Sequence, residues 1–275
     1  MSEILALPDI SRKEFLVLRD YLHQSFGLEL RDGKERLVIA RLSKFVKAGN
    51  FVSFEQYIRH VQTDPTGDRL TDLIDAMTTN HTSFMREPEH FRFFLGTVLP
   101  ELGRRSSVSV WSAACSTGEE PYSLLFSVAD AQQSSAISDV RITATDISTR
   151  VLRNAKEAIF TMEKVRALPP GWLQKFFQAP DKIAATAQVK AEWRSKIEFQ
   201  RYNLMHALPF RKLFSAIFCR NVMIYFDKPT QSSVVKRLSA ALEPGGYLMV
   251  GHSESLTGLD HSLQYVKPAI YRKAL

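Results

Sequence analysis

Trp111-Ser-Ala-Ala-Cys-Ser-Thr-Gly-Glu-Glu-Pro-Tyr-Ser123 is the stretch that decides the fold of this chain. A short apolar run, Val108 to Trp111, leads into small residues with one glycine, and a helix-like run follows from Tyr122 to Asp130. This order is typical of the strand–turn–helix of a nucleotide-binding α/β unit, in which small residues let the backbone approach a ligand.

The two glutamates of this stretch, Glu119 and Glu120, narrow the class of ligand. They stand at the start of the expected helix, where they would repel a phosphate group. They suit a ligand that has a cationic end and ribose hydroxyls. S-adenosylmethionine (SAM) is such a ligand.

The composition bounds the class of protein. With 275 residues, of which 45% are hydrophobic and 24% charged, the chain resembles an ordinary globular protein with one large or two modest domains. We expect no direct membrane insertion, because the start resembles no leader and no apolar run is long enough for a span. Cys115 and Cys219 lie in strand or loop contexts that look buried, which favours a reducing cytoplasm. Two separate cysteines and seven scattered histidines predict no metal site.

The net charge of +7 is unevenly distributed. Residues 1–76 carry 11 Lys and Arg against 12 Asp and Glu, whereas residues 77–275 carry 25 against 17. A positive excess of this kind favours an acidic partner, which can be a nucleic acid, an anionic lipid or a protein.

Residues 1–76 are predicted to form a small helical domain. Ser11 and Glu14 have the spacing of a capping box, and apolar residues recur at helical intervals from Phe15. We expect residues 77–107 to be a linker and connecting helix.

Residues 108–275 are predicted to alternate strands and helices, which favours a mainly parallel, Rossmann-like sheet with right-handed crossovers. An antiparallel hairpin is expected at Leu263–Arg272. The expected strands are Val108–Ser112, Val140–Thr145, Ile197–Tyr202, Phe214–Cys219 and Gly246–Gly251. Between the second and third of them, residues 159–196 are too long for one crossover helix and are predicted to be an inserted subdomain, with strand character at Gln188–Trp193.

Polar residues follow several of these strands, at the edge where open α/β sheets bind ligands. Asp146 ends the second strand, where it fits either a ribose contact or the N-cap of the next helix. Four further polar residues follow later strands, and they fit either ligand contacts or the ordinary capping of strand ends. They are Asn203, Arg220, Asn221 and Tyr225.

Two further segments carry candidate binding residues. Residues 77–87 gather short polar side chains beside Arg86, as a strap across a polar ligand would. On the helix expected near Gly33–Ala48, the cations lie opposite the apolar face, so they form either a solvated face or a surface for an acidic partner. These cations are Lys34, Arg36, Arg41, Lys44 and Lys47.

Four ordered motifs together resemble the bacterial chemotaxis receptor methyltransferases, the CheR family. They are Thr78-Thr-Asn-His-Thr-Ser-Phe-Met-Arg86, Ser112-Ala-Ala-Cys-Ser-Thr-Gly-Glu-Glu-Pro-Tyr-Ser123, Cys219-Arg-Asn-Val-Met-Ile-Tyr-Phe-Asp227 and Gly245-Gly-Tyr-Leu-Met-Val-Gly-His-Ser-Glu254. The resemblance covers nearly the whole chain, and Met85 stands where an aromatic residue is common.

The resemblance implies an all-α N-terminal domain, a SAM-dependent methyltransferase domain and a small β-subdomain inserted in it. It implies transfer of a methyl group from SAM to glutamate carboxylates on the helical bundle of chemoreceptors, which gives methyl esters and S-adenosylhomocysteine. It further implies a cytoplasmic monomer recruited to receptor arrays. The implied SAM contacts are Asn80, Thr82, Arg86, Glu120, Asp146, Asn203, Leu204, Arg220 and Asn221. Arg86 and Tyr225 would lie beside the transferred methyl group, and Arg41, Lys44 and Lys47 would meet the receptor.

Two rival functions stay open at this point. A nucleic-acid methyltransferase shares the fold, but an Asp/Asn-Pro-Pro-aromatic motif or a Pro-Cys nucleophile is expected there, and this chain has Cys219-Arg-Asn-Val222 after its fourth strand. A SAM-binding module without catalysis would lack the Arg86 and Tyr225 positions. Whether the inserted subdomain binds a receptor tail peptide is also left open by the sequence.

Overall fold

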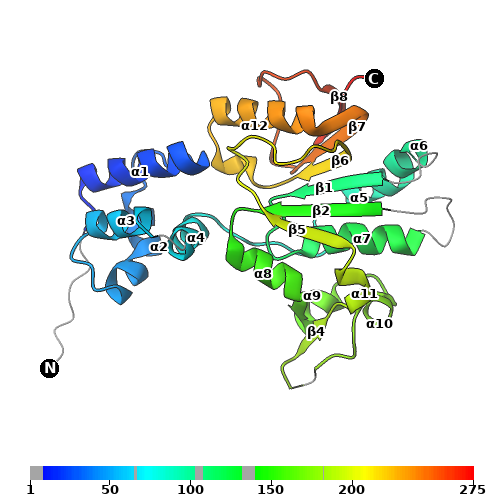
Figure 1. The fold of residues 1–275 in the computed structure, drawn as a ribbon, viewed down its shortest axis with the longest axis horizontal. Coiled ribbons are helices and arrows are strands. Elements are labelled where there is room, and N and C mark those ends of the chain that lie inside the picture. Colours follow the sequence, from blue (N-terminus) through cyan, green and yellow to red (C-terminus); the bar gives the residue numbers. More distant parts are fainter. Residues whose placement is uncertain (1–8, 65–66, 103–107, 132–139, 182) are drawn as a thin grey trace. The chain divides into compact units, whose positions relative to one another are not determined.

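A computed structural model describes residues 9–64, 67–102, 108–131, 140–181 and 183–275 of the chain (Figure 1). By its internal contacts the chain divides into two compact units. One contains Met1–Asn80 together with Tyr225–Asp227, and the other contains His81–Ile224 and Lys228–Leu275.

The first unit is helical. Its helices are α1 (Arg12–Phe26), α2 (Glu35–Ala48), α3 (Phe54–Gln62) and α4 (Asp68–Met77). The predicted capping box is confirmed, since the Ser11 side chain accepts the Glu14 N–H and the Glu14 carboxylate accepts the Ser11 N–H. Gly27 ends α1 in a left-handed conformation that favours glycine.

A short segment from far along the chain completes this helical unit. Leu28 forms an antiparallel β-bridge with Phe226, and the Glu29 N–H donates to the Tyr225 carbonyl at 2.7 Å. The Asp227 carboxylate lies 2.9 Å from the His23 ring. Residues 225–227 therefore pack with the helices although they follow a strand of the other unit.

The second unit is built on a seven-stranded sheet of order β5-β2-β1-β6-β7-β9-β8. Its first five strands in that order run parallel, and β9 is antiparallel to both of its neighbours. The predicted mainly parallel sheet and the closing hairpin are thus confirmed. The strands are β1 (Val108–Ala113), β2 (Val140–Asp146), β5 (Ile197–Arg201), β6 (Phe214–Cys219), β7 (Leu242–Val250), β8 (Gln264–Lys267) and β9 (Ile270–Arg272).

Helices cover both faces of this sheet (Figure 1). α7 (Glu119–Ala131) and α8 (Thr149–Glu157) lie on one face, and α12 (Lys228–Ala241) lies on the other. From β1 the chain continues to β2 and β5 on one side of the sheet, and from β6 it continues to β7 on the other side, so the strand order reverses between β1 and β6. Because each crossover is right-handed, crossovers that run in opposite directions place their helices on opposite faces of the sheet. That reversal is the point at which open α/β sheets bind their ligands.

Residues between the strap and the sheet form α5 (Pro88–Phe93), the π-helical turn η1 (Phe94–Val98) and α6 (Leu99–Leu102). Phe91 and Phe94 are buried and stack or pack edge-on against Phe218 of β6. This segment therefore ties the residues after Arg86 firmly to the sheet.

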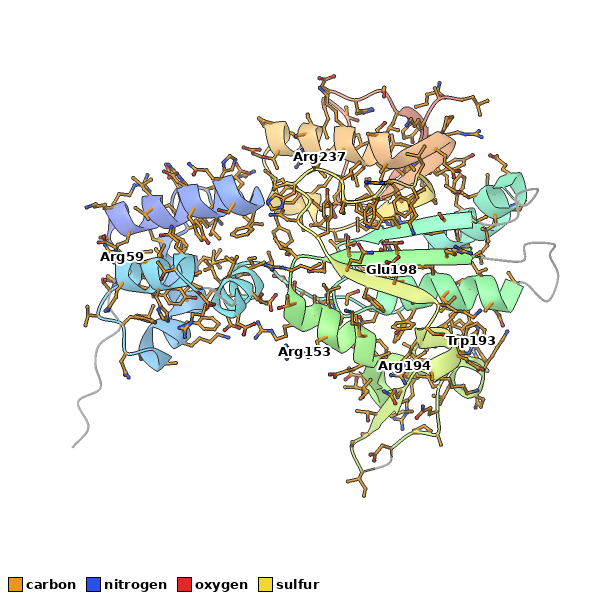
Figure 2. All side chains as sticks on the ribbon, in the orientation of Figure 1. Arg59, Arg153, Trp193, Arg194, Glu198 and Arg237 are labelled. Carbon is orange, nitrogen blue, oxygen red and sulfur yellow. The ribbon has the colours of Figure 1, made fainter. Side chains whose placement is uncertain are left out.

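The inserted segment contains β3 (Ile159–Thr161), α9 (Met162–Arg166), α10 (Trp172–Phe176), β4 (Thr186–Gln188) and α11 (Ala191–Arg194). The expected strand character at Gln188–Trp193 is wrong for most of that range, because β4 ends at Gln188 and α11 follows. The insert is anchored by aromatic contacts, since Phe176 stacks on Phe126 of α7 with ring centroids 4.2 Å apart. Trp193, labelled in Figure 2, packs edge-on against Phe176.

Among the helices that the structure describes, none combines the length and the apolar character needed to cross a membrane.

Candidate functional site

The turn after β1 has an unusual backbone. Ala114, Ser116 and Gly118 all have positive φ, at 66°, 48° and 98°. A Cβ on Gly118 would lie 3.0 Å from the Cβ of Ala155 in α8. Gly118 is therefore required at least in part by the packing of α8, whereas the sequence suggested only a close approach to a ligand.

The two glutamates of the turn have different roles. Glu119 is fully buried, accepts from the Thr117 hydroxyl at 2.6 Å and is paired with Lys164 of the insert. Glu120 accepts from the Ser112 hydroxyl at 2.7 Å and from Arg220 Nη1 at 2.8 Å. Glu119, which the sequence suggested together with Glu120 as suited to a cationic ligand, thus already has a cation of the protein beside it.

Arg220 is the centre of the site, and its side chain is only 2% exposed. Besides Glu120, it donates through Nη2 to Glu87 at 3.0 Å and to the backbone carbonyl of Arg86. Asn221 donates to the other oxygen of Glu87 at 3.2 Å. These contacts bring together Arg86, Glu120, Arg220 and Asn221, which the sequence predicted as one site.

Burial and ion pairing act in opposite directions on these carboxyl groups. Burial raises the pKa of Glu120, and Arg220 and Ser112 only partly oppose that effect. Burial would also raise the pKa of Glu87, but Arg220, Asn221 and the His252 N–H together bring it below its ordinary value. The cluster thus shifts the pKa values of two neighbouring carboxyl groups in opposite directions, upward for Glu120 and downward for Glu87.

Asp146 lies at the carboxyl end of β2 and joins two turns. Its two oxygens accept from the Ser116 N–H at 2.9 Å and the Ser148 N–H at 3.0 Å. The N-cap of α8 is Ser148, whose side chain accepts from the Val151 N–H. The alternative interpretation of Asp146 as that N-cap is therefore wrong.

The residues after β5 lie on the same edge of the sheet. The Asn203 side chain accepts from the Met205 N–H at 3.0 Å, and the Leu204 carbonyl accepts from Arg237 of α12 at 3.0 Å. Arg237 is labelled in Figure 2. Thr82 is half-buried in the strap, and Arg86 donates to the His81 carbonyl at 3.0 Å, which folds the strap back on itself.

Asn80 and Tyr225 belong to the helical unit. The Tyr225 hydroxyl accepts from the Thr79 N–H at 3.0 Å and faces the Thr79 carbonyl at 3.2 Å. Asn80 donates to Asp75 of α4 at 2.9 Å. The beginning of the strap is therefore fixed by a tyrosine of the segment 225–227 and by the end of α4.

The basic face of α2 is not uniform. Arg41 is half-buried and donates to the carbonyls of Ala76 and Met77 at 3.3 and 2.6 Å, so it caps the end of α4. Lys44 and Lys47 are exposed, and the Lys44 ammonium lies 4.8 Å from the centroid of the Phe45 ring. Of the three predicted receptor contacts, only the two lysines are exposed.

Glu87, His90 and His252 place ligand-type atoms within 4.8 Å of one another. Both oxygens of Glu87 already accept hydrogen bonds, from Arg220, Asn221 and the His252 N–H. A cation there would also lie close to the Arg220 guanidinium. We therefore assign the cluster to the Arg220 network rather than to a metal.

Two residues of the site received no role from the sequence. Glu87 follows Arg86 directly, and Glu254 ends the fourth motif after β7. The position of Glu254 after a buried strand was a usable signal, because polar residues there reach the ligand edge of the sheet. Nothing in the sequence indicates that both carboxylates converge on the turn after β6.

Comparisons with known proteins find sequences similar to this chain over nearly its whole length. Residues 80–271 match the model of the SAM-binding domain of CheR methyltransferases, and residues 13–78 match that of their all-alpha domain. The chain is 36% identical to a chemotaxis protein methyltransferase of Borreliella burgdorferi, with 96% of this chain and 95% of that protein covered. It is also 36% identical to chemotaxis protein methyltransferase 2 of Pseudomonas aeruginosa, with 96% and 94% covered.

Proposed function

Since this chain belongs to the CheR methyltransferase family and is a SAM-dependent methyltransferase of chemotaxis, we propose that it esterifies glutamate side chains on the helical bundle of chemoreceptors. The product would be a glutamate methyl ester, with S-adenosylhomocysteine as the second product. The observation that carries the site assignment is the cluster of buried Arg220 with the partly buried Glu120 and Glu87 at the switch point of the sheet.

The residues of this cluster fit SAM. The ligand has an ammonium and a sulfonium, a carboxylate and ribose hydroxyls, so it needs both acidic and basic partners. Arg220 is buried, the Glu120 side chain beside it is 13% exposed, and Arg220 Nε is buried without a hydrogen-bond partner among the residues that the structure describes. We assign the ribose hydroxyls to Asp146, and the amino-acid end of the ligand to Glu120, Arg220 and Arg86.

The chemistry requires little proton transfer. Bound SAM supplies a methyl group on cationic sulfur, and the C–S electron pair stays on sulfur as a carboxylate oxygen takes the methyl. A glutamate with a pKa near ~4.3 is already ionised at neutral pH, so no general base is needed. In agreement, burial raises the pKa values of both Cys115 and Cys219 well above their ordinary range, which makes neither a nucleophile.

The protein contributes position and exclusion of water. Arg86 is proposed to hold the substrate carboxylate by a charge-assisted pair, and Tyr225 to give it one hydrogen bond. Too tight a pair would lower the nucleophilicity of the carboxylate. Both residues are therefore given an orienting role.

The receptor is the acidic partner that the charge distribution favours. Lys44 and Lys47 on α2 are the exposed cations proposed to meet its helical bundle, with Arg41 fixed behind them. Docking of a receptor tail peptide at the inserted subdomain is a second contact of this proposal. The enzyme would act as a monomer in the cytoplasm, at membrane-bound receptor arrays.

One experiment separates this function from its rivals. The protein is incubated with methyl-labelled SAM and a chemoreceptor cytoplasmic fragment, and in parallel with DNA and RNA. Base-labile label on the receptor fragment supports the proposal, because methyl esters hydrolyse in base. Label on nucleic acid, or SAM binding without transfer to any of the three, would contradict it.

A further inference from the structure

The turn after β6 carries Arg220 and Asn221 and has a backbone that needs outside support. Asn221 has a φ of 58°, in the left-handed region, and after Val222 the residues Met223–Tyr225 form a single 3-10 turn. Neither element gives its first N–H groups a partner of its own. In a partly buried place those groups must be satisfied by another part of the protein.

Glu254 provides that support. One of its oxygens accepts from the Asn221 N–H at 2.8 Å and the Gly251 N–H at 2.6 Å. The other accepts from the Met223 N–H at 2.7 Å and the Ile224 N–H at 3.3 Å. The residue is 7% exposed, so four backbone donors replace the water around a buried carboxylate.

The close approach of the Gly251 backbone to Asn221 is a second, independent observation that the turns after β6 and β7 are held together. A Cβ on Gly251 would lie 2.5 Å from Asn221 Nδ2, 2.9 Å from Asn221 N and 2.9 Å from Glu254 Oε2. Only glycine allows the end of β7 to approach the turn this closely. The turn after β6 is therefore held against the turn after β7 by both shape and charge.

Glu87 and Glu254 accept different kinds of hydrogen bond from the turn after β6. Glu87 accepts from the side chains of Arg220 and Asn221, whereas the partners of Glu254 among the described residues are backbone N–H groups. Loss of Glu87 would remove a charge partner of Arg220. Loss of Glu254 would leave every side chain of the cluster in place and release the backbone beneath it.

We propose that Glu254 is a positioning residue of the cofactor site: it holds the left-handed turn at Asn221 so that Arg220 and Asn221 face bound SAM. The inference rests on the proposed assignment of Arg220 and Asn221 to that site. It gives Glu254 a role in cofactor affinity without any contact to the cofactor.

The test compares Glu254→Gln with Glu243→Gln. The amide introduced at position 254 would keep the shape of the side chain but offer only one acceptor oxygen to four N–H groups. Glu243 is the matched control, because it lies at the opposite end of β7 and accepts from Ser215 of β6 at 3.0 Å. Calorimetry with S-adenosylhomocysteine and amide hydrogen exchange of the free protein are the two readouts.

We expect Glu254→Gln to weaken S-adenosylhomocysteine binding at least about tenfold and to speed exchange across residues 219–225. Glu243→Gln should change neither, even where both variants lose similar thermal stability. If Glu254→Gln fails to fold, Gly251→Ala presses on the same turn with the carboxylate intact and should weaken binding likewise. Wild-type affinity in these variants would overturn the inference, whereas a wild-type protein that does not bind the ligand would overturn the proposed site itself.

Discussion

The Tyr225 hydroxyl and the backbone of Thr79 satisfy each other, with the Thr79 N–H donating at 3.0 Å and the Thr79 carbonyl accepting at 3.2 Å. A residue expected beside the transferred methyl group thus also fixes the start of the strap. Its hydroxyl must exchange at least one of these partners for a substrate carboxylate when it orients the substrate.

Tyr225→Phe is therefore expected to lower turnover more than it lowers receptor affinity. A bond that is made mainly in the transition state affects kcat, whereas uniform binding affects KM. The loss of the Thr79 contacts should also destabilise the helical unit by about 1 kcal/mol. Steady-state kinetics and thermal unfolding measure the two effects. Tyr265→Phe, at an exposed site, is the control, and full turnover in Tyr225→Phe would remove Tyr225 from the catalytic role.

Asp146→Ala is expected to weaken SAM and S-adenosylhomocysteine binding together. The loss of one or two charge-assisted hydrogen bonds to ribose corresponds to about 1.5–3 kcal/mol each. The variant also frees the Ser116 and Ser148 N–H groups, which Asp146 holds in place. Calorimetry with both ligands measures the change, and equal affinities in wild type and variant would exclude Asp146 from the site.

Lys44→Glu combined with Lys47→Glu is expected to raise KM for the receptor and leave SAM affinity unchanged. Attraction to an acidic bundle is screened over about 8 Å at physiological ionic strength, so the salt dependence of methylation should flatten as well. Lys228→Glu with Lys236→Glu on α12 gives the same change in net charge at another place and is the control. A wild-type KM at low and high salt would show that this face is only solvated surface.

Arg41→Glu is expected to behave differently from the lysine variants. Its guanidinium donates to the carbonyls of Ala76 and Met77, so the variant should lose stability of the helical unit by about 1–3 kcal/mol. Thermal unfolding of the single variant separates this effect from receptor binding. An unchanged melting temperature would mean that Arg41 contributes nothing to the end of α4.

His90 predicts an acid-sensitive fold. Burial, then the nearby Arg220 charge, lowers the pKa of His90 from 6.5 to about 4. The stability that comes from keeping the ring neutral is complete above pH 6.5 and is lost as the pH falls through 4, by about 3 kcal/mol in total. Denaturant unfolding between pH 7 and pH 4 measures the slope. His90→Phe should be less sensitive over this window, and an identical pH dependence in both proteins would rule the ring out as the cause.

The sequence predicted those parts of the fold that depend on local pattern. The buried strands, for example Phe214–Cys219, were readable because apolar runs were separated by helical stretches and turn residues. The capping box at Ser11 was readable from two residues three positions apart. The closing hairpin and the mainly parallel sheet followed from the order of these elements.

Pairings between distant residues could not be read in this way. Glu119 and Glu120 are neighbours with the same side chain, yet Lys164 takes one and Arg220 takes the other. Arg41 lies at the correct helical angle for a basic surface, but its guanidinium donates a hydrogen bond to the Met77 carbonyl at the end of α4. In each case the role of the residue depends on which distant segment of the chain packs against it in the folded protein. The periodicity of apolar and polar residues along the sequence does not contain that information.

The bridge between Leu28 and Phe226 has a consequence for how this protein can vary. The segment 225–227 is encoded far from the helices but shares its backbone hydrogen bonds with residues 28 and 29. A chimaera that exchanges residues 1–80 for those of a relative would break this pairing unless residues 225–227 were exchanged with them. The two segments should therefore be inherited as a pair, and a chimaera that exchanges the helices alone should lose stability of the helical unit.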